Sequence, residues 1–222
     1  MIPLRDSQRS HSTPFVTIAL IAINVLIFLY QVSLDPFSRN HLVMAYGLVP
    51  SRLDSTAVLT SIFLHGGWLH ILGNMWFLWI FGDNVEDILG HGRYLVFYLL
   101  CGVAAALIHV AFNPLSRVPT VGASGAIAGV MGAYVVKFPK SRILTLVPIF
   151  VFFTTIEVPA ILMLLYWFAI QFFSGIGSIG YSHLSEGGVA WFAHVGGFVA
   201  GILAILVMRP RKRFGRRYDL NW

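Results

Sequence analysis

Apolar residues are gathered in long runs, separated by short polar, glycine-rich or proline-containing breaks. Most of these runs approach the length of about 20 apolar residues that a helix needs to cross a bilayer. The pattern predicts an all-α membrane bundle of six transmembrane helices at Phe15–Val32, Leu69–Phe81, Tyr94–Phe112, Ala123–Phe138, Ala160–Phe173 and Ala190–Met208. The second helix is expected to continue through DNVEDILG to a Gly-His-Gly break at residues 90–92.

Three stretches between these runs are too apolar or too rich in glycine to be simple linkers. Residues 33–68 predict an ordered loop with short helices on the membrane surface. The stretch LTLVPIFVFFTTIEVP, residues 144–159, is apolar but is interrupted by two prolines and Glu157, which favours an interfacial segment over a spanning helix. Residues 175–188 are rich in glycine and serine, so we expect them to form a mobile lid.

The composition supports a membrane protein. Of the 222 residues, 57% are hydrophobic and 11% are charged, whereas soluble domains carry about 25% charged residues. The mean hydropathy is +0.78. Cys101 is the single cysteine, which excludes an intramolecular disulfide and a thiolate metal cluster.

The placement of the basic residues predicts the orientation in the membrane. Six crossings put both termini on one side, and that side then holds most of the basic residues: Arg5, Arg9, Arg93, Lys137, Lys140, Arg142 and the tail after residue 208. Basic residues that flank spans mark the cytoplasmic side. We therefore expect a cytoplasmic tail at residues 1–14, a six-helix domain at 15–208 and a basic cytoplasmic tail at 209–222. The bilayer, rather than nucleic acid, explains the net charge of +6.

Polar side chains inside spans are costly, so each one needs a reason. Four of them are predicted near the outer ends of their helices: Ser124 at the start of the fourth span, His194 in the sixth, and His70 and Asn74 in the second. His70 and Asn74 are four residues apart and therefore share one helix face. Alone, each residue has a structural explanation, such as tight packing for a serine or interhelical hydrogen bonding for a histidine or an asparagine.

Small residues predict that the fourth and sixth spans pack closely. They form one stripe in each span, which comprises Gly125, Ala128, Gly129 and Gly132 in the fourth, and Gly197 and Gly201 beside His194 in the sixth. Such stripes let membrane helices approach until their backbones touch. If the two stripes meet, Ser124 and His194 come within hydrogen-bond distance, as an activated serine and its base require.

The fourth span is short, and Ser124 opens it. About 16 residues give a helix of about 24 Å, whereas the hydrocarbon layer is about 30 Å thick. Ser124 is therefore expected below the outer surface, beside a water-filled cavity. Gly122 and Gly125 allow a sharp turn and close packing there, and the helix N-terminus favours negative charge on a reacting oxygen. His70 and Asn74 can add hydrogen-bond donors.

Three motifs, G-A-S-G at 122–125, H-I-L-G-N at 70–74 and A-H-V-G-G at 193–197, resemble the signatures of the rhomboid intramembrane serine proteases. The resemblance implies a dyad in which Ser124 is the nucleophile and His194 the general base and acid. It also implies an oxyanion hole formed by His70, Asn74 and the backbone N–H groups of Ala123 and Ser124. Glu86 matches a family acid that ties the cytoplasmic helix ends together.

The resemblance further implies transmembrane proteins as substrates, reached between the second and fifth spans, and a location in the inner (cytoplasmic) membrane of a bacterium. No cofactor and no metal are implied. One departure stands out: many bacterial members carry an aromatic residue four positions after the serine, where it stacks on the catalytic histidine. Ala128 occupies that position here, so something else must hold His194.

Other functions fit the sequence less well. The metalloprotease motif H-E-x-x-H and paired intramembrane aspartates are both absent from the sequence. A small transporter is expected to show an internal repeat or paired charges in its spans, and neither is visible. The main alternative is a catalytically silent rhomboid-like protein that binds or escorts membrane proteins. Such relatives typically lack the serine or the histidine, and this chain keeps both.

Overall fold

A computed structural model describes residues 2–149, 152–178, 190–208 and 215–216. Its main helices are α1 (Phe15–Ser33), α4 (Trp68–Leu89), α5 (His91–Phe112), α6 (Ser124–Lys137), α7 (Ala160–Ser178) and α8 (Trp191–Val207). Shorter helices are α2 (Pro36–Tyr46), α3 (Ser55–Thr60) and the 3-10 turns η1 (Pro50–Arg52) and η2 (Ser61–Phe63). The six long helices match the six predicted apolar runs to within a few residues at most ends, and α7 continues to Ser178.

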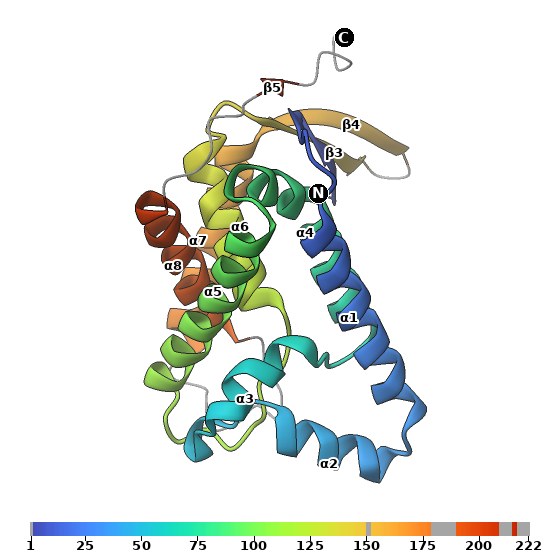
Figure 1. Cartoon of the computed structure of the whole chain (residues 1–222), viewed down its shortest axis with the longest axis vertical. Helices are drawn as coiled ribbons and strands as arrows, with labels where there is room; N and C mark the ends of the chain where they lie inside the picture. Colours follow the sequence, from blue (N-terminus) through green and yellow to red (C-terminus); the bar gives the residue numbers. More distant parts are fainter. Residues whose placement is uncertain (1, 150–151, 179–189, 209–214, 217–222) are drawn as a thin grey trace.

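The long helices form one bundle, with α6 at its centre. Figure 1 shows α1 and α4 on one side and α5, α7 and α8 on the other, while α2 and α3 lie across one end. Every residue of α6 from Gly125 to Val135 is buried. Small side chains permit this position, because a helix of glycine and alanine can be surrounded closely by its neighbours.

The bundle has the properties of a membrane protein. Within the described residues, α1 and α5 are each long and apolar enough to cross a bilayer, and α3–η2 with α4 forms a further candidate span bent by 86°. The outer helix faces carry large exposed apolar side chains, such as Leu26 on α1, Tyr166 on α7 and Val207 on α8. Soluble proteins rarely expose so much contiguous apolar surface. The number of six crossings stays a prediction, because α6, the Ala160–Ser174 part of α7, and α8 are apolar but shorter than a full span.

The expectation of an all-α fold is wrong for one end of the molecule. β3 (Arg142–Ile149) and β4 (Phe152–Pro159) form an antiparallel hairpin, and β1 (Ile2–Asp6) pairs with β3 to give the order β1-β3-β4. A second, small pair joins β2 (Gln8–Arg9) to β5 (Gly215–Arg216). The segment at 144–159 is thus a hairpin, because its β-branched and aromatic residues favour strands and its prolines oppose a helix.

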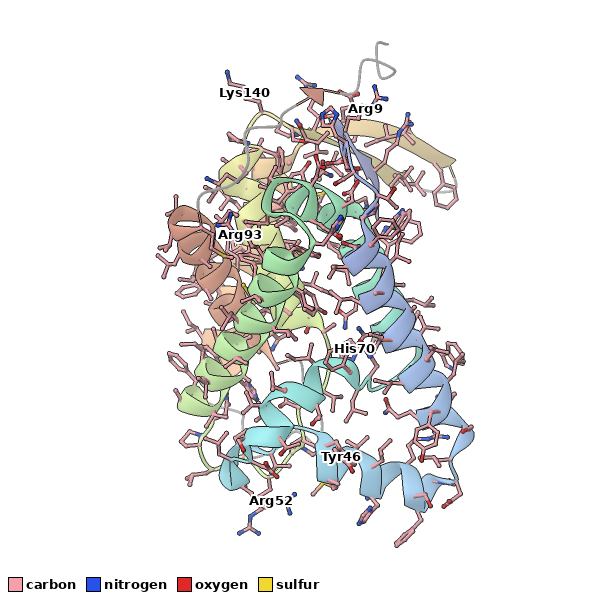
Figure 2. The ribbon with its side chains drawn as sticks, in the orientation of Figure 1. Arg9, Tyr46, Arg52, His70, Arg93 and Lys140 are labelled. Carbon is pink, nitrogen blue, oxygen red and sulfur yellow. The ribbon has the colours of Figure 1, made fainter. Side chains whose placement is uncertain are left out.

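The basic residues divide between the two ends of the bundle. Arg9, Arg93 and Lys140 lie toward the end that carries the sheet, whereas Arg52 lies at the opposite end (Figure 2). β1 near the N-terminus and β5 near the C-terminus both lie at the sheet end (Figure 1). The described part of the predicted N-terminal tail is therefore ordered: β1 pairs with β3 of the hairpin, and β2 pairs with β5.

Candidate active site

Ser124 is the first residue of α6, and Gly122 sets the turn that leads into it. Gly122 has a φ of +130°, a conformation that side-chain-bearing residues rarely adopt. Its N–H donates to the carbonyl of Ser61 at 2.9 Å, which fastens the turn to η2. The N-cap residue is Ala123, whose side chain makes no capping hydrogen bond. The first N–H groups of a helix have no partner within it, so those of this turn can donate to a group bound beside Ser124.

His194, on the first turn of α8, lies directly against Ser124. The Nε2 atom of His194 is 2.7 Å from the Oγ atom of Ser124. The backbones of α6 and α8 touch, because a Cβ atom on Gly197 would meet the backbone of Gly125, and one on Gly201 would meet that of Gly129. The two glycine stripes thus meet as the spacing predicts. The structure brings the serine and histidine together, while their catalytic roles stay predictions.

His70 and Asn74 lie on α4 and face the turn at Gly122. A Cβ atom at position 122 would lie 2.7 Å from His70 Nε2 and 3.5 Å from Asn74 Nδ2. Any side chain there would thus fill the space that these two donors border. The Nδ1 atom of His70 accepts from the N–H of Gly66 at 3.4 Å. In a neutral imidazole the proton then resides on Nε2, which can donate toward the turn.

His65, in the loop before α4, holds the amide of Asn74. The Nε2 atom of His65 lies 3.0 Å from Asn74 Nδ2, and the backbone of His65 exchanges two hydrogen bonds with the side chain of Gln31 on α1. Burial, assisted by nearby His70, lowers the pKa of His65 from 6.5 to about 4. A neutral His65 accepts from Asn74 and fixes the direction of the amide.

A cavity of about 1050 Å³ connects these residues. Ser124, His194, His70 and Asn74 all line it, with Gly122 at its wall. Half-buried Ser124 and His70 show that the cavity admits water-sized groups to the serine. Helices α4 and α7 border it through Phe77 and Trp167. The arrangement suits a nucleophile, a base and converging N–H donors around one reacting carbonyl.

Two residues of α7 that contact His194 are not among the predicted site residues. Gln171 Oε1 lies 2.6 Å from His194 Nδ1, and the ring centroids of Trp167 and His194 are 5.7 Å apart. Gln171 is a polar residue inside the predicted fifth span. Because polar side chains inside spans are costly, it could have been singled out from the sequence as Ser124 was. Ala128, where an aromatic residue was noted as missing, is fully buried on α6.

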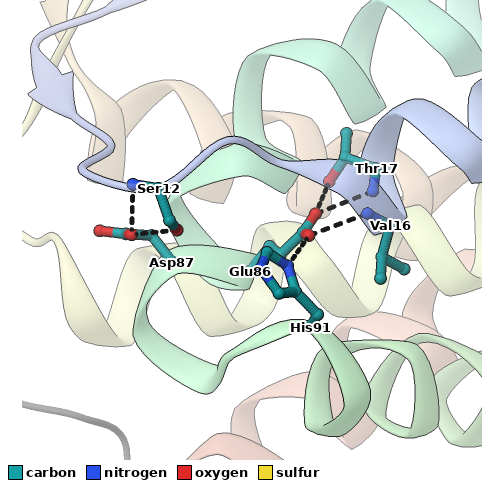
Figure 3. Close-up of polar contacts among 6 residues, drawn as sticks. All are labelled: Ser12, Val16, Thr17, Glu86, Asp87 and His91. Atoms are coloured by element: carbon teal, nitrogen blue, oxygen red, sulfur yellow. Dashed lines mark hydrogen bonds and ion pairs between the residues drawn. The ribbon is translucent and has the colours of Figure 1, made fainter.

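Glu86, near the end of α4, joins three helices at the sheet end of the bundle (Figure 3). Its carboxylate accepts from the N–H groups of Val16 and Thr17 at 2.9 and 2.8 Å and from the Thr17 hydroxyl at 2.7 Å. His91 Nδ1, at the start of α5, lies 2.6 Å from the same carboxylate. Next to it, Asp87 accepts from the N–H and hydroxyl of Ser12. Glu86 thus caps α1 and links it to α4 and α5.

Among the described residues, no group of three or more histidine, cysteine, aspartate or glutamate side chains is arranged to hold a metal ion. The predicted lid at 175–188 falls mostly outside the described residues, as does most of the basic tail at 209–222. The described part of the lid stretch, residues 175–178, ends α7 as helix.

Comparison with known proteins gives a consistent family. Residues 53–211 match the family model for the Rhomboid domain. The chain is 30% identical to Rhomboid protease GluP of Bacillus subtilis (strain 168) over 211 residues, which cover 92% of this chain and 37% of that protein. It is 31% identical to Rhomboid protein 1, mitochondrial, of Saccharomyces cerevisiae (strain ATCC 204508 / S288c) over 135 residues, or 58% of this chain and 38% of that protein. It is 29% identical to RHOMBOID-like protein 1 of Arabidopsis thaliana over 200 residues, which cover 85% of this chain and 46% of that protein. The chain thus spans less than half the length of these relatives.

Proposed function

This chain belongs to the rhomboid family, and we propose that it is an intramembrane serine endopeptidase that cuts peptide bonds in or near transmembrane segments of other proteins. The observation that carries the proposal is the 2.7 Å contact between Ser124 Oγ and His194 Nε2. A serine and a histidine at this distance, beside a cavity and a free helix N-terminus, have the geometry that nucleophilic acyl transfer requires.

In the first half of the proposed reaction, Ser124 Oγ attacks the scissile carbonyl carbon and its proton passes to His194 Nε2. The carbonyl oxygen becomes an oxyanion, which accepts hydrogen bonds from His70, Asn74 and the N–H groups of Ala123 and Ser124. The carbon–nitrogen bond then breaks, and the imidazolium returns its proton to the leaving amine. The products are an acyl ester on Ser124 and a free peptide amine.

Water completes the proposed reaction. His194 Nε2 takes a proton from a water molecule in the cavity, and the resulting hydroxide attacks the ester carbonyl. A second oxyanion forms at the same donors and collapses to release a carboxylic acid, while His194 returns the proton to Ser124 Oγ. Both halves use the same base and the same donor set, so no third acid is needed for proton balance.

We place the protein across the inner (cytoplasmic) membrane of a bacterium with six spans and both termini cytoplasmic. The clustering of Arg9, Arg93 and Lys140 toward the sheet end supports this orientation (Figure 2). The 14 residues of α6 give a length of about 21 Å, shorter than a hydrocarbon layer of about 30 Å. With its basic end at the cytoplasmic surface, α6 would hold Ser124 below the outer surface, where transmembrane substrates unwind.

We expect substrates to reach the cavity between α4 and α7. Phe77 of α4 and Trp167 of α7 both line the cavity, so a separation of these helices would open it toward lipid. A substrate helix must unwind locally to present a carbonyl to Ser124, because its backbone groups are otherwise bonded to each other. Helix-breaking residues near the cut are therefore expected.

The proposal is tested with purified protein in detergent micelles, a reporter substrate that contains one transmembrane segment, and a fluorophosphonate probe. We expect cleavage and labelling of Ser124, both abolished by Ser124→Ala. Ser51 is an exposed serine that does not line the cavity. Ser51→Ala is therefore the matched control, which should keep both cleavage and labelling. Substrate binding without cleavage or labelling would instead support the catalytically silent alternative.

A further inference from the structure

His194 is held from the side opposite Ser124 by helix α7. Its Nε2 faces Ser124 Oγ at 2.7 Å and its Nδ1 faces Gln171 Oε1 at 2.6 Å. Both side chains are almost completely buried, with 9% of His194 and 7% of Gln171 exposed. In such surroundings a hydrogen bond is strong, and an unmade one is costly.

The chemistry of the amide fixes the tautomer of the imidazole. An amide oxygen accepts hydrogen bonds and cannot donate them, so His194 Nδ1 must carry the proton that joins it to Gln171. The lone pair of the neutral ring is then on Nε2, facing the Ser124 hydroxyl. The opposite tautomer would place a proton between Nε2 and Ser124 and leave no base there.

Packing from α7 adds to this hydrogen bond. Trp167 lies one helical turn before Gln171 on the same face of α7, and its ring centroid is 5.7 Å from that of His194. Ala128 on α6 offers a methyl group where a ring could otherwise stack. The structure therefore moves the support of the imidazole from α6 to α7.

We propose that Gln171 is the positioning residue of His194: its amide oxygen selects the imidazole tautomer that activates Ser124. The inference rests on the proposed function and adds a residue that positions the base of the Ser124–His194 dyad. Gln171 is a neutral amide, so it orients the base without the strong preference for the imidazolium that a carboxylate would give. Since Gln171 belongs to α7, a displacement of that helix would also break the hydrogen bond that orients His194.

A purely structural role must be distinguished from this one, because Gln171 also joins α7 to α8. In the part of the chain that the structure describes, the titratable groups that interact electrostatically with His194 are His70 on α4 and His109 on α5. Trp167 and Trp191 contact its ring. A carboxylate at position 171 would therefore be a new charge beside the base, and its effect on the pH profile reports on the base itself.

The first experiment measures cleavage by the full chain in micelles. Gln171→Leu should lower kcat about 10- to 100-fold with little change in KM. Gln171→Glu should keep more activity, and the acid limb of its kcat/KM profile should move to higher pH, because the carboxylate favours the protonated ring. Phe172→Leu, at the next and half-exposed position, is the control with an unchanged profile. Unchanged kcat in Gln171→Leu, or an unmoved acid limb in Gln171→Glu, would overturn the inference.

The second experiment is independent of cleavage. Protein labelled with 15N-histidine should show the Nδ1–H tautomer at His194, assigned by the loss of its signal in His194→Gln, and Gln171→Leu should lose this preference. A proton found on Nε2 in the unaltered protein would refute the role of Gln171. If the tautomer is as expected but no Ser124-dependent cleavage occurs, the proposed function fails while the hold of Gln171 on the ring is upheld.

Discussion

Gly197 on α8 faces Gly125 on α6 with no space for a side chain between them, since a Cβ atom at position 197 would overlap the Gly125 backbone. His194 lies one turn before Gly197, and Ser124 directly precedes Gly125. The separation of the serine and the imidazole is therefore set by the contact between two backbones, which is a rigid spacer.

Gly197→Ala should accordingly damage both stability and activity. The added methyl group forces α6 and α8 apart, and overpacking of this kind costs about 1–3 kcal/mol. We expect earlier thermal unfolding in micelles and a loss of substrate cleavage that exceeds the loss of folded protein. Gly92 on α5 has nothing within 4 Å of its Cβ position, so Gly92→Ala should preserve both. A fully active Gly197→Ala would show that backbone contact does not set the geometry.

Asn74→Ala tests the oxyanion hole. The change removes one donor from the cavity and should slow cleavage by about 10²–10³-fold, mainly through kcat. Substrate affinity, measured in the inactive variant Ser124→Ala, should be the same with and without Asn74→Ala. Leu72→Ala, on the exposed side of α4, is the matched control. A rate near that of the unaltered protein would assign Asn74 a structural role only.

Much of the architecture can be predicted from the sequence, because membrane helices appear there as apolar runs with clear ends. The four polar residues of the site stand out for the same reason, as Ser124 and His194 have few polar neighbours in their spans. The glycine stripes even predict which two helices touch. These signals are local in the chain or follow one helix face, so no knowledge of the fold is required to see them.

Other features of the fold and the site depend on contacts between segments, which the sequence of one segment does not reveal. The sequence predicts a single interfacial segment where the β3–β4 hairpin forms, because the apolar residues of this stretch hide the alternation that would mark two strands. Gln171 is visible as a polar residue, but its partner depends on how α7 packs against α8. The same holds for His65, whose bond to Asn74 requires the loop before α4 to fold back over that helix.

The burial of His65 predicts a pH dependence of stability. Its pKa falls from 6.5 to about 4 on folding because burial disfavours the charged ring. Between these values the unfolded chain binds a proton that the folded protein does not, so stability decreases as pH falls from about 6.5 to about 4. One such proton contributes at most about 1.4 kcal/mol per pH unit.

His65→Gln should therefore reduce the slope of unfolding free energy against pH in this range, while its amide oxygen can still accept from Asn74. Cleavage should be largely retained in His65→Gln and impaired in His65→Leu, which offers no acceptor. His41 is exposed on α2, so His41→Gln serves as the matched control for the replacement of a histidine. Equal slopes in His65→Gln and the parent protein would contradict the assignment.

Glu86→Gln tests whether the sheet end of the bundle is held by one carboxylate. An amide in this position can accept through only one atom, so the N–H group of Val16 or that of Thr17 loses its partner at the N-terminus of α1. Hydrogen bonds to charged groups contribute about 1.5–3 kcal/mol, and unfolding by heat or by denaturing detergent should shift accordingly. Glu157 pairs with Arg142 at 3.6 Å on the more exposed hairpin, where an ion pair contributes less than about 1 kcal/mol. Glu157→Gln should therefore leave the unfolding transition almost unchanged. Equal shifts in the two variants would show that the buried carboxylate of Glu86 contributes no more to stability than an exposed one.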